Sequence, residues 1–304
     1  MKFKKLFAAV AAGLMMSSLA ACGSTSGSSE ETSADTSADT ASADTSAAEN
    51  SAAVAGEDNF DKILKVGVKD AVIGFGYKDP LSGEYSGLEI ELAKKIADSL
   101  GYKDVEFTTV TAATRTELLD SGDLDCVLAT FTITDERKKS WDFSTAYYTD
   151  AVTVLVETAD GITNIDGLVG KKIGVSTGST SAYALVKAMS EKGLLGNYAI
   201  PESSADFDIS SFSEGGTSFE QFGDYPAISN AMTAGTVDAF CVDKSILATY
   251  KSDDRQYIED TFSPQEYGVA TKKDSPLSAP IDELIKTWLE DGTIDGLITE
   301  YGLN

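Results

Sequence analysis

One pattern occurs twice in this chain and constrains its fold more than any other feature. Residues 118–127 (LLDSGDLDCV) predict the end of a helix, a glycine, an aspartate and a buried strand, and residues 231–240 (AMTAGTVDAF) repeat that order 113 positions later. Around both copies, strand patterns alternate with helix patterns, which is typical of a parallel α/β sheet. The sequence therefore predicts two similar α/β lobes.

The elements next to the first copy have the clearest patterns. We expect strands at 64–68, 105–110 and 126–129, and helices at 87–100 and 114–121. In the second half we expect a strand at 168–175, a loop at 176–181 and a helix at about 182–192. The stretch 196–224 has more residues than a strand connection needs, so we expect a surface loop there.

The beginning of the chain predicts export. Three lysines precede an apolar stretch from Leu6 to Met16 that is too short to span a bilayer, so residues 1–21 are expected to be a signal peptide. The tetrad LAAC that ends at Cys22 resembles the bacterial lipobox, which would make Cys22 the lipidated first residue of the mature protein. The alternative is an ordinary signal peptide followed by an incidental cysteine.

Residues 22–58 predict a disordered acidic tether. They are nearly all Ser, Thr, Ala, Gly, Asp and Glu, with Ser-Ala-Asp-Thr recurring at Ser33, Ser37 and Ser42. Such a segment buries too little apolar area to fold. A flexible chain of this length reaches roughly 30 Å, which suits a leash better than a metal-binding tract.

Charge and cysteine content exclude several classes of partner. The net charge of −25 becomes −28 when the three signal-peptide lysines are removed, so nucleic acid is not an expected partner. No cofactor and no metal are expected. Cys126 and Cys241 both lie in predicted buried strands, and a disulfide between them is not expected if the strands belong to different lobes.

The segment Ala129–Arg137 (ATFTITDER) predicts a carboxylate-binding site. The buried strand before it ends in the hydroxyls of Thr130 and Thr132, and Arg137 follows on a capped helix start. An arginine fork pairs bidentately with a carboxylate, and hydroxyls satisfy its remaining lone pairs. An isolated T-x-x-R would instead be a surface arginine beside a polar turn.

Other polar residues also follow predicted strands. In open α/β sheets ligands bind at the carboxyl ends of strands, and those ends carry Lys69, the 176–181 loop and Asp243. Asp243 follows a buried strand, so its carboxylate needs a cation, and an α-ammonium group would serve. The alternative is that Asp243 caps the helix expected at 245–250 or pairs with Lys244.

These residues together resemble the family 3 solute-binding proteins of polar amino acid ABC transporters, over nearly all of 64–303. The likeness looks closest to the aspartate- and glutamate-binding members. The matching stretches are Val66–Lys69, Gly87–Ala93, Thr114-Arg115, Ala129–Arg137, Asp142–Ser144 with Tyr147-Tyr148, Val237–Phe240 with Val242–Ser245, and Tyr267-Gly268. The family implies a type II periplasmic-binding-protein-like fold whose two lobes close about a hinge.

The resemblance assigns a role to each end of the ligand. Arg137 and Thr132 would take the α-carboxylate and Asp243 the α-ammonium, while Phe75 would pack over the ligand. The 178–180 loop, with Ser179 and Thr180, would add donors from the second lobe, as a helix N-terminus can for an anion.

Lys69 and Arg115 occupy positions where the acidic-ligand members carry a lysine and an arginine, so they would bind a side-chain carboxylate. On local sequence alone, Arg115 could equally be a solvated helix residue. The chain departs from the family at Ile73, where many members have proline, and at Ser176, where some carry a longer residue. Glutamine or cystine is the alternative ligand.

The resemblance also implies an organisation and partners. Two crossover strands would join lobe one (59–149 and 266–304) to lobe two (150–265). The protein is expected to be a monomer that binds a free amino acid and docks on a membrane permease. We expect it on the extracytoplasmic face of the cell membrane of a Gram-positive bacterium.

An enzyme or a ligand sensor on the same fold is the rival interpretation. The chain has no histidine, so a Ser-His or Cys-His nucleophile and a His-ligated zinc are excluded. A carboxylate or Ser-Lys mechanism would have to use Glu89 or Lys69. Because the resemblance implies a binding protein, we expect no catalytic residues.

Overall fold

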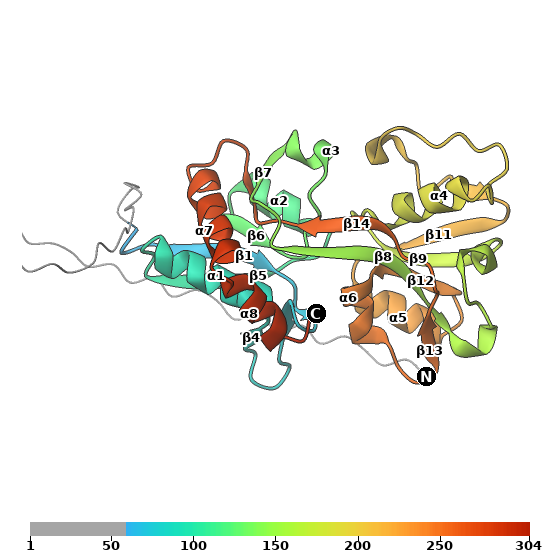
Figure 1. Cartoon of the computed structure of the whole chain (residues 1–304), viewed down its shortest axis with the longest axis horizontal. Helices are drawn as coiled ribbons and strands as arrows, with labels where there is room; N and C mark the ends of the chain where they lie inside the picture. The colour runs from blue at the N-terminus through green and yellow to red at the C-terminus, as the bar shows by residue number, and fades with distance from the viewer. Residues whose placement is uncertain (1–58) are drawn as a thin grey trace, which may run out of the picture. The chain divides into compact units, whose positions relative to one another are not determined.

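The computed structural model describes residues 59–304, which fold as two α/β lobes (Figure 1). Lobe one holds a five-stranded sheet in which β1 pairs in parallel with β5 and β6. In sheet order its strands are β5 (Asp104–Thr109), β1 (Ile63–Val68), β6 (Cys126–Leu128), β15 (Ala270–Lys272) and β7 (Trp141–Phe143). A small antiparallel sheet beside it consists of β2 (Ala71–Val72), β3 (Gly76–Lys78) and β4 (Tyr85–Ser86).

Lobe two holds the larger sheet. Its strands follow the order β10 (Ser213–Glu214), β11 (Thr217–Phe222), β9 (Lys172–Ser176), β12 (Ala239–Asp243), β8 (Tyr148–Glu157) and β13 (Arg255–Tyr257), and β14 (Phe262–Tyr267) also pairs with β8. β9 lies parallel to both β11 and β12, as expected for an α/β lobe.

Helices cover both sheets. Those of lobe one are α1 (Leu88–Ser99), α2 (Thr114–Ser121), α3 (Asp135–Lys138), α7 (Ser278–Glu290) and α8 (Thr293–Glu300). Those of lobe two are α4 (Ser181–Glu191), α5 (Tyr225–Thr233) and α6 (Lys244–Leu247). Short 3₁₀ turns span Thr158–Asp160, Ile165–Leu168, Ser204–Asp206 and Ala248–Tyr250.

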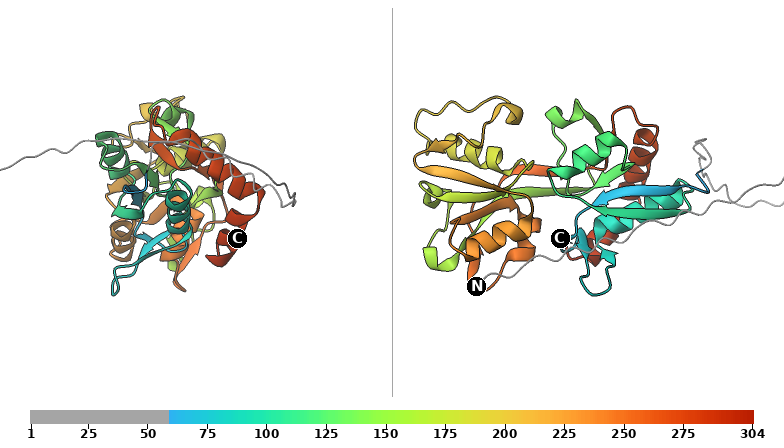
Figure 2. Two further views of the ribbon diagram at one scale, coloured as in Figure 1. Left: turned by 90° about the vertical axis from the view of Figure 1, so that its left-hand side faces the viewer. Right: turned by 180° about the vertical axis from the view of Figure 1, so that it is seen from behind.

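The antiparallel strands β8 and β14 run from one lobe to the other, and they do so in the view from behind as well (Figure 2). The expectation of two lobes joined by two crossover strands is therefore confirmed. Because both strands continue through the junction, no single residue marks a boundary. The limits at 149/150 and 265/266 stay predictions.

The twofold sequence pattern corresponds to a repeated structure. α2 leads into β6, and α5 leads into β12. In both copies the aspartate before the strand accepts a backbone bond from the neighbouring strand: Asp125 Oδ2 from Lys65 N at 2.8 Å, and Asp238 Oδ2 from Lys172 N at 2.7 Å. The repeated aspartate thus fixes how each helix–strand unit joins its sheet.

Two expectations for lobe two are wrong. The strand predicted at 168–175 begins only at Lys172, because Ile165–Leu168 forms a 3₁₀ turn and Gly170 follows with a φ of 79°. The stretch 196–224 is not simply a surface loop, because β11 within it pairs with β9 over five residues. That strand matters for the site, since the residues after it reach the cleft.

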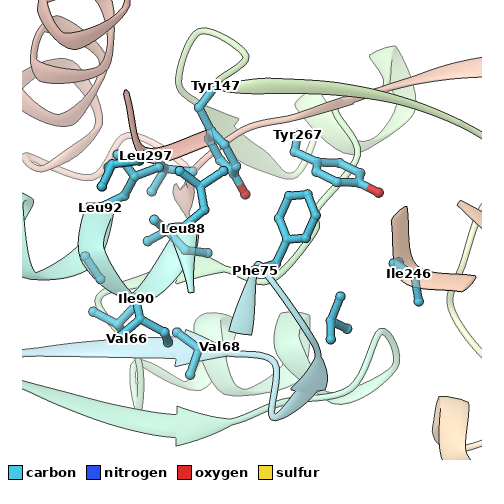
Figure 3. Close-up of a cluster of buried hydrophobic side chains, with 14 of the residues drawn as sticks. Val66, Val68, Phe75, Leu88, Ile90, Leu92, Tyr147, Ile246, Tyr267 and Leu297 are labelled. Carbon is cyan, nitrogen blue, oxygen red and sulfur yellow. The ribbon is translucent and has the colours of Figure 1, made fainter. Parts of the chain in front are cut away.

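A continuous cluster of buried side chains links the lobes. It includes Val66, Leu88 and Phe75 of lobe one, Tyr267 of the crossover strand and Ile246 of lobe two (Figure 3). A separate apolar cluster lies within lobe two. The lobes therefore share part of their core next to the hinge strands.

Some predictions concern residues that the structure does not describe. The signal peptide, Cys22 and the tether lie outside residues 59–304. Within 59–304, every helix is too short or too polar to cross a bilayer. Cys126 and Cys241 are both free and buried, and they lie in different sheets.

Candidate functional site

A small cleft between the lobes brings together seven of the nine predicted ligand-binding residues. Its enclosed volume is only about 10 Å³, which is room for about one water molecule. Lobe one contributes Ala112, Arg115, Thr130, Thr132 and Arg137, and lobe two contributes Ser179, Thr180, Ser181, Tyr225, Val242 and Asp243. In this arrangement the side chains of the two lobes therefore nearly fill the cleft.

The guanidinium of Arg137 connects the two sides of the cleft. Thr134 caps α3 by accepting from the backbone N–H of Arg137 at 3.1 Å, so Arg137 lies in the first turn of α3. Its Nη1 donates to the carbonyl of Thr132 at 2.7 Å, and its Nη2 donates to the carbonyl of Gly178 in lobe two at 3.1 Å. Burial lowers the pKa of Arg137 to about 9.

Arg115 is buried beside the same segment. Its Nη1 donates to the carbonyls of Ala129 at 2.9 Å and Thr130 at 3.3 Å, and its Cζ lies 3.7 Å from the ring centroid of Phe131. Its Nε is buried without a hydrogen-bond partner. Burial lowers the pKa of Arg115 to about 10. The alternative, a solvated helix residue, is therefore wrong, since only 3% of Arg115 is exposed.

Lys69 follows β1 and is also buried, although it does not line the cleft. Its Nζ lies 5.3 Å from the ring centroid of Tyr225, which does line it. Burial, and then the charge of Arg115, lower the pKa of Lys69 to about 7. Among residues 59–304, no carboxylate lies within 4.0 Å of the charged groups of Lys69, Arg115 or Arg137.

Asp243 ends β12 and is the carboxylate that lines the cleft. It occupies the N-cap position of α6, but its side chain makes no capping bond, and Asp150 Oδ2 accepts from the N–H of Ser245 instead. The capping interpretation is therefore wrong. Asp243 Oδ2 accepts from the hydroxyl of Tyr267 at 2.5 Å, yet burial raises the pKa of Asp243 to about 7.

Gln265 fixes the direction of two hydroxyls in the cleft. Its Nε2 donates to the carbonyl of Ser263 at 2.9 Å, so its Oε1 must accept the bonds from Thr132 Oγ1 and Thr180 Oγ1, both at 2.8 Å. Each threonine hydroxyl therefore uses its one hydrogen in the bond to Gln265. Toward a ligand, both side chains act only as acceptors.

Lobe two adds donors at the start of α4. The hydroxyls of Ser179 and Ser181 are buried without a partner and line the cleft. Ser179 was predicted by name and Ser181 lies in the predicted 176–181 loop, but Tyr225 was not predicted. Tyr225 directly follows Asp224, the N-cap of α5, just beyond the end of β11. The rule that selects residues after strands would have found it if β11 had been recognised.

Phe75 does not line the cleft. It is fully buried in the core, edge-on to Tyr148 with a centroid distance of 4.9 Å. It is also edge-on to Tyr267 at 5.7 Å (Figure 3). A contact between Phe75 and a ligand stays a prediction. Residues 59–304 contain no cluster of Cys, Asp and Glu side chains that could hold a metal ion.

Comparison with known proteins identifies the family of this chain. The model of the bacterial extracellular solute-binding proteins, family 3, matches residues 64–304. The chain belongs to this family. The ABC transporter glutamine-binding protein GlnH of Bacillus subtilis (strain 168) is 33% identical over 289 residues, which cover 93% of this chain and 91% of that protein. The glutamine-binding protein of Geobacillus stearothermophilus is 31% identical over 231 residues, which cover 73% of this chain and 79% of that protein.

Solved structures agree with this assignment. An ancestral arginine-binding protein bound to arginine aligns with a TM-score of 0.65 and 29% identity, covering 80% of this chain and 99% of that chain. The expected family and its type II two-lobed fold are therefore confirmed. The expected closeness to the aspartate- and glutamate-binding members is not supported by these relatives and stays a prediction.

The contact between Gly178 and lobe one yields a test of closure. A Cβ on Gly178 would lie 2.8 Å from the carbonyl oxygen of Ala112, and its φ is 78°. We expect Gly178→Ala to weaken binding by at least about tenfold, because the lobes can no longer meet. Calorimetric titration with the twenty amino acids measures the affinity for the tightest ligand.

Gly193→Ala is the matched control for this test. Gly193 has a φ of 73° but open space around it, so alanine there adds only a backbone cost of about 1–2 kcal/mol. We expect a lower melting temperature with wild-type affinity. Equal affinities of Gly178→Ala and Gly193→Ala would contradict the role of this contact.

Proposed function

We propose that this protein captures an acidic amino acid, aspartate or glutamate, and delivers it to the membrane permease of an ABC transporter. One observation supports the acidic ligand most strongly. Lys69, Arg115 and Arg137 are cations in or beside one small cleft, and none has a carboxylate within 4.0 Å among residues 59–304. Buried charges without partners are costly, so an anionic ligand would stabilise this site.

The α-amino and α-carboxyl groups of the ligand have partners of opposite character. Arg137 and the hydroxyls of Ser179 and Ser181 are donors suited to the α-carboxylate. Asp243 would accept from the α-ammonium, together with the lone pairs of Thr132 and Thr180. Thr132 was expected to bind the α-carboxylate. Because its hydroxyl donates its hydrogen to Gln265, it can only accept a bond from the ligand, which favours the α-ammonium.

The ligand side chain would meet the free Nε of Arg115, and Lys69, which lies beside Tyr225 and not on the wall of the cleft, would add its charge. A neutral amide would leave these two cations without an anion in a closed cleft, at a cost of several kcal/mol. Glutamine is the second candidate, because both curated relatives named above are glutamine-binding proteins. The charge of the cleft favours the acid, and the relatives favour the amide.

We also propose that the protein is not an enzyme. The groups in the cleft are donors and acceptors that match an amino acid zwitterion, and Glu89, the carboxylate considered for catalysis, does not line the cleft. A monomer held to the membrane through a lipid on Cys22 completes the proposal.

The first test of specificity is calorimetric titration with glutamate, aspartate, glutamine and asparagine. We expect the acids to bind about 100-fold or more tightly than the amides. Arg115→Ala should compress that ratio, because it removes a side-chain contact. Arg137→Ala should weaken all four ligands by at least about tenfold, because it removes the α-carboxylate partner. Tighter binding of glutamine by the wild-type protein would refute the acidic ligand.

The pKa values near 7 predict different pH profiles for the acid and the amide. Below pH 7, Asp243 is protonated before binding and must lose that proton to accept the ammonium. Above pH 7, Lys69 is neutral and must gain a proton to pair with a side-chain carboxylate. Glutamate affinity should therefore peak near pH 7. Glutamine affinity should fall only on the acid side.

Titrations from about pH 5.5 to about pH 8.5 measure both profiles. Asp243→Asn should flatten the acid side while weakening binding overall. Glutamate and glutamine profiles of the same shape would contradict a role for Lys69 in side-chain recognition.

The proposed anchor is tested by Cys22→Ser. Without an acylated cysteine the protein has no lipid to hold it at the membrane, so it should pass into the medium of a single-membrane bacterium. Fractionation and immunoblotting measure the distribution. Membrane retention equal to that of the wild type would argue against the anchor.

A further inference from the structure

Glu89 is a fully buried carboxylate on α1 that does not line the cleft. Its Oε1 accepts from the backbone N–H of Thr130 at 2.5 Å and from the hydroxyl of Tyr147 at 2.6 Å. Its Oε2 is buried without a partner. Its chain neighbours Leu88 and Ile90 are buried and apolar. Burying a carboxylate here costs free energy, which its hydrogen bonds offset only in part.

The bond to Thr130 holds an unusual backbone conformation. Thr130 has a φ of 45°, which a β-branched residue rarely adopts because its Cβ crowds the backbone. The bond from its N–H to Glu89 lies on one side of this turn. On the other side, the carbonyls of Ala129 and Thr130 accept from Nη1 of Arg115.

We propose that Glu89 is a positioning residue whose reach holds the turn at Ala129-Thr130 and thereby orients Arg115 toward the ligand side chain. This role rests on the proposed binding of an acidic amino acid.

Two conservative variants separate the effect of the side-chain length of Glu89 from the effect of its charge. Glu89→Gln keeps the length and an acceptor oxygen but loses the charge. Glu89→Asp keeps the charge but is one methylene shorter, so it cannot reach Thr130 N from the same backbone position. Calorimetry with glutamate and glutamine gives both affinities and their ratio, and thermal melting followed by circular dichroism checks the fold.

We expect Glu89→Gln to keep glutamate affinity within about threefold of wild type or better. Glu89→Asp should lose about tenfold or more of glutamate affinity and less of glutamine affinity. The opposite order, in which Gln damages binding and Asp does not, would mean that charge alone matters and would overturn the proposal. So would a wild-type glutamate-to-glutamine ratio in Glu89→Asp.

Thr130→Gly provides a second measurement that does not depend on Glu89→Asp folding by itself. Glycine adopts a φ of 45° without strain, so its backbone does not need the bond to Glu89. In the Thr130→Gly background, Glu89→Asp should cost less than about threefold in glutamate affinity. An undiminished loss would overturn the positioning role.

The wild-type titration separates failure of the ligand proposal from failure of this one. If the wild type binds glutamine more tightly, the acidic ligand is wrong, and the same variants are compared on glutamine. A weaker Glu89→Asp and a normal Glu89→Gln would then still support the positioning role. Equal binding by Glu89→Asp and wild type would overturn it.

Discussion

The site depends on one physical constraint, the free-energy cost of burying cations that have no anion beside them. Lys69 and Arg115 are buried, and Arg137 lies between the lobes with both Nη groups bound to carbonyls. The effective cost of burying one ion is several kcal/mol. The protein offsets part of it with backbone carbonyls and with the ring of Phe131 under both arginines, at 3.7 and 4.8 Å. A ligand that supplies negative charge would offset more.

The crossover strand β14 ties this electrostatic site to the relative position of the lobes. Gln265 on that strand accepts from Thr132 of lobe one and Thr180 of lobe two, and Tyr267 donates to Asp243. A change at the hinge would therefore alter the hydroxyls and the carboxylate that face the cleft. We therefore expect ligand binding and closure to be coupled through these side chains, because a ligand that prefers this arrangement stabilises it.

Fold and site were predictable to different extents. The period of the apolar pattern was sufficient for α1 and α4 to within one residue, and the predicted limits of α2 coincide with the observed ones although its apolar pattern is weak. The strand β11 was missed because its sequence, TSFEQF, has no apolar alternation and the strand is stabilised by pairing with β9. Tyr225 was missed with it. Asp243 was found from its place after a strand and Arg137 from its place on a capped helix, whereas Arg115 was found only through the resemblance to the family.

The sequence by itself determined the local elements, the two-lobed organisation and the residue types that can bind an amino acid, because each depends on spacing and chemistry along the chain. Only the tertiary structure decided which polar atoms remain without partners. Thr132 became an acceptor through Gln265, 133 residues away, and Glu89 reached Thr130 across 41 residues. Asp243 was freed from capping because Asp150 took that bond. Such assignments depend on contacts between distant segments, which no local pattern in the sequence contains.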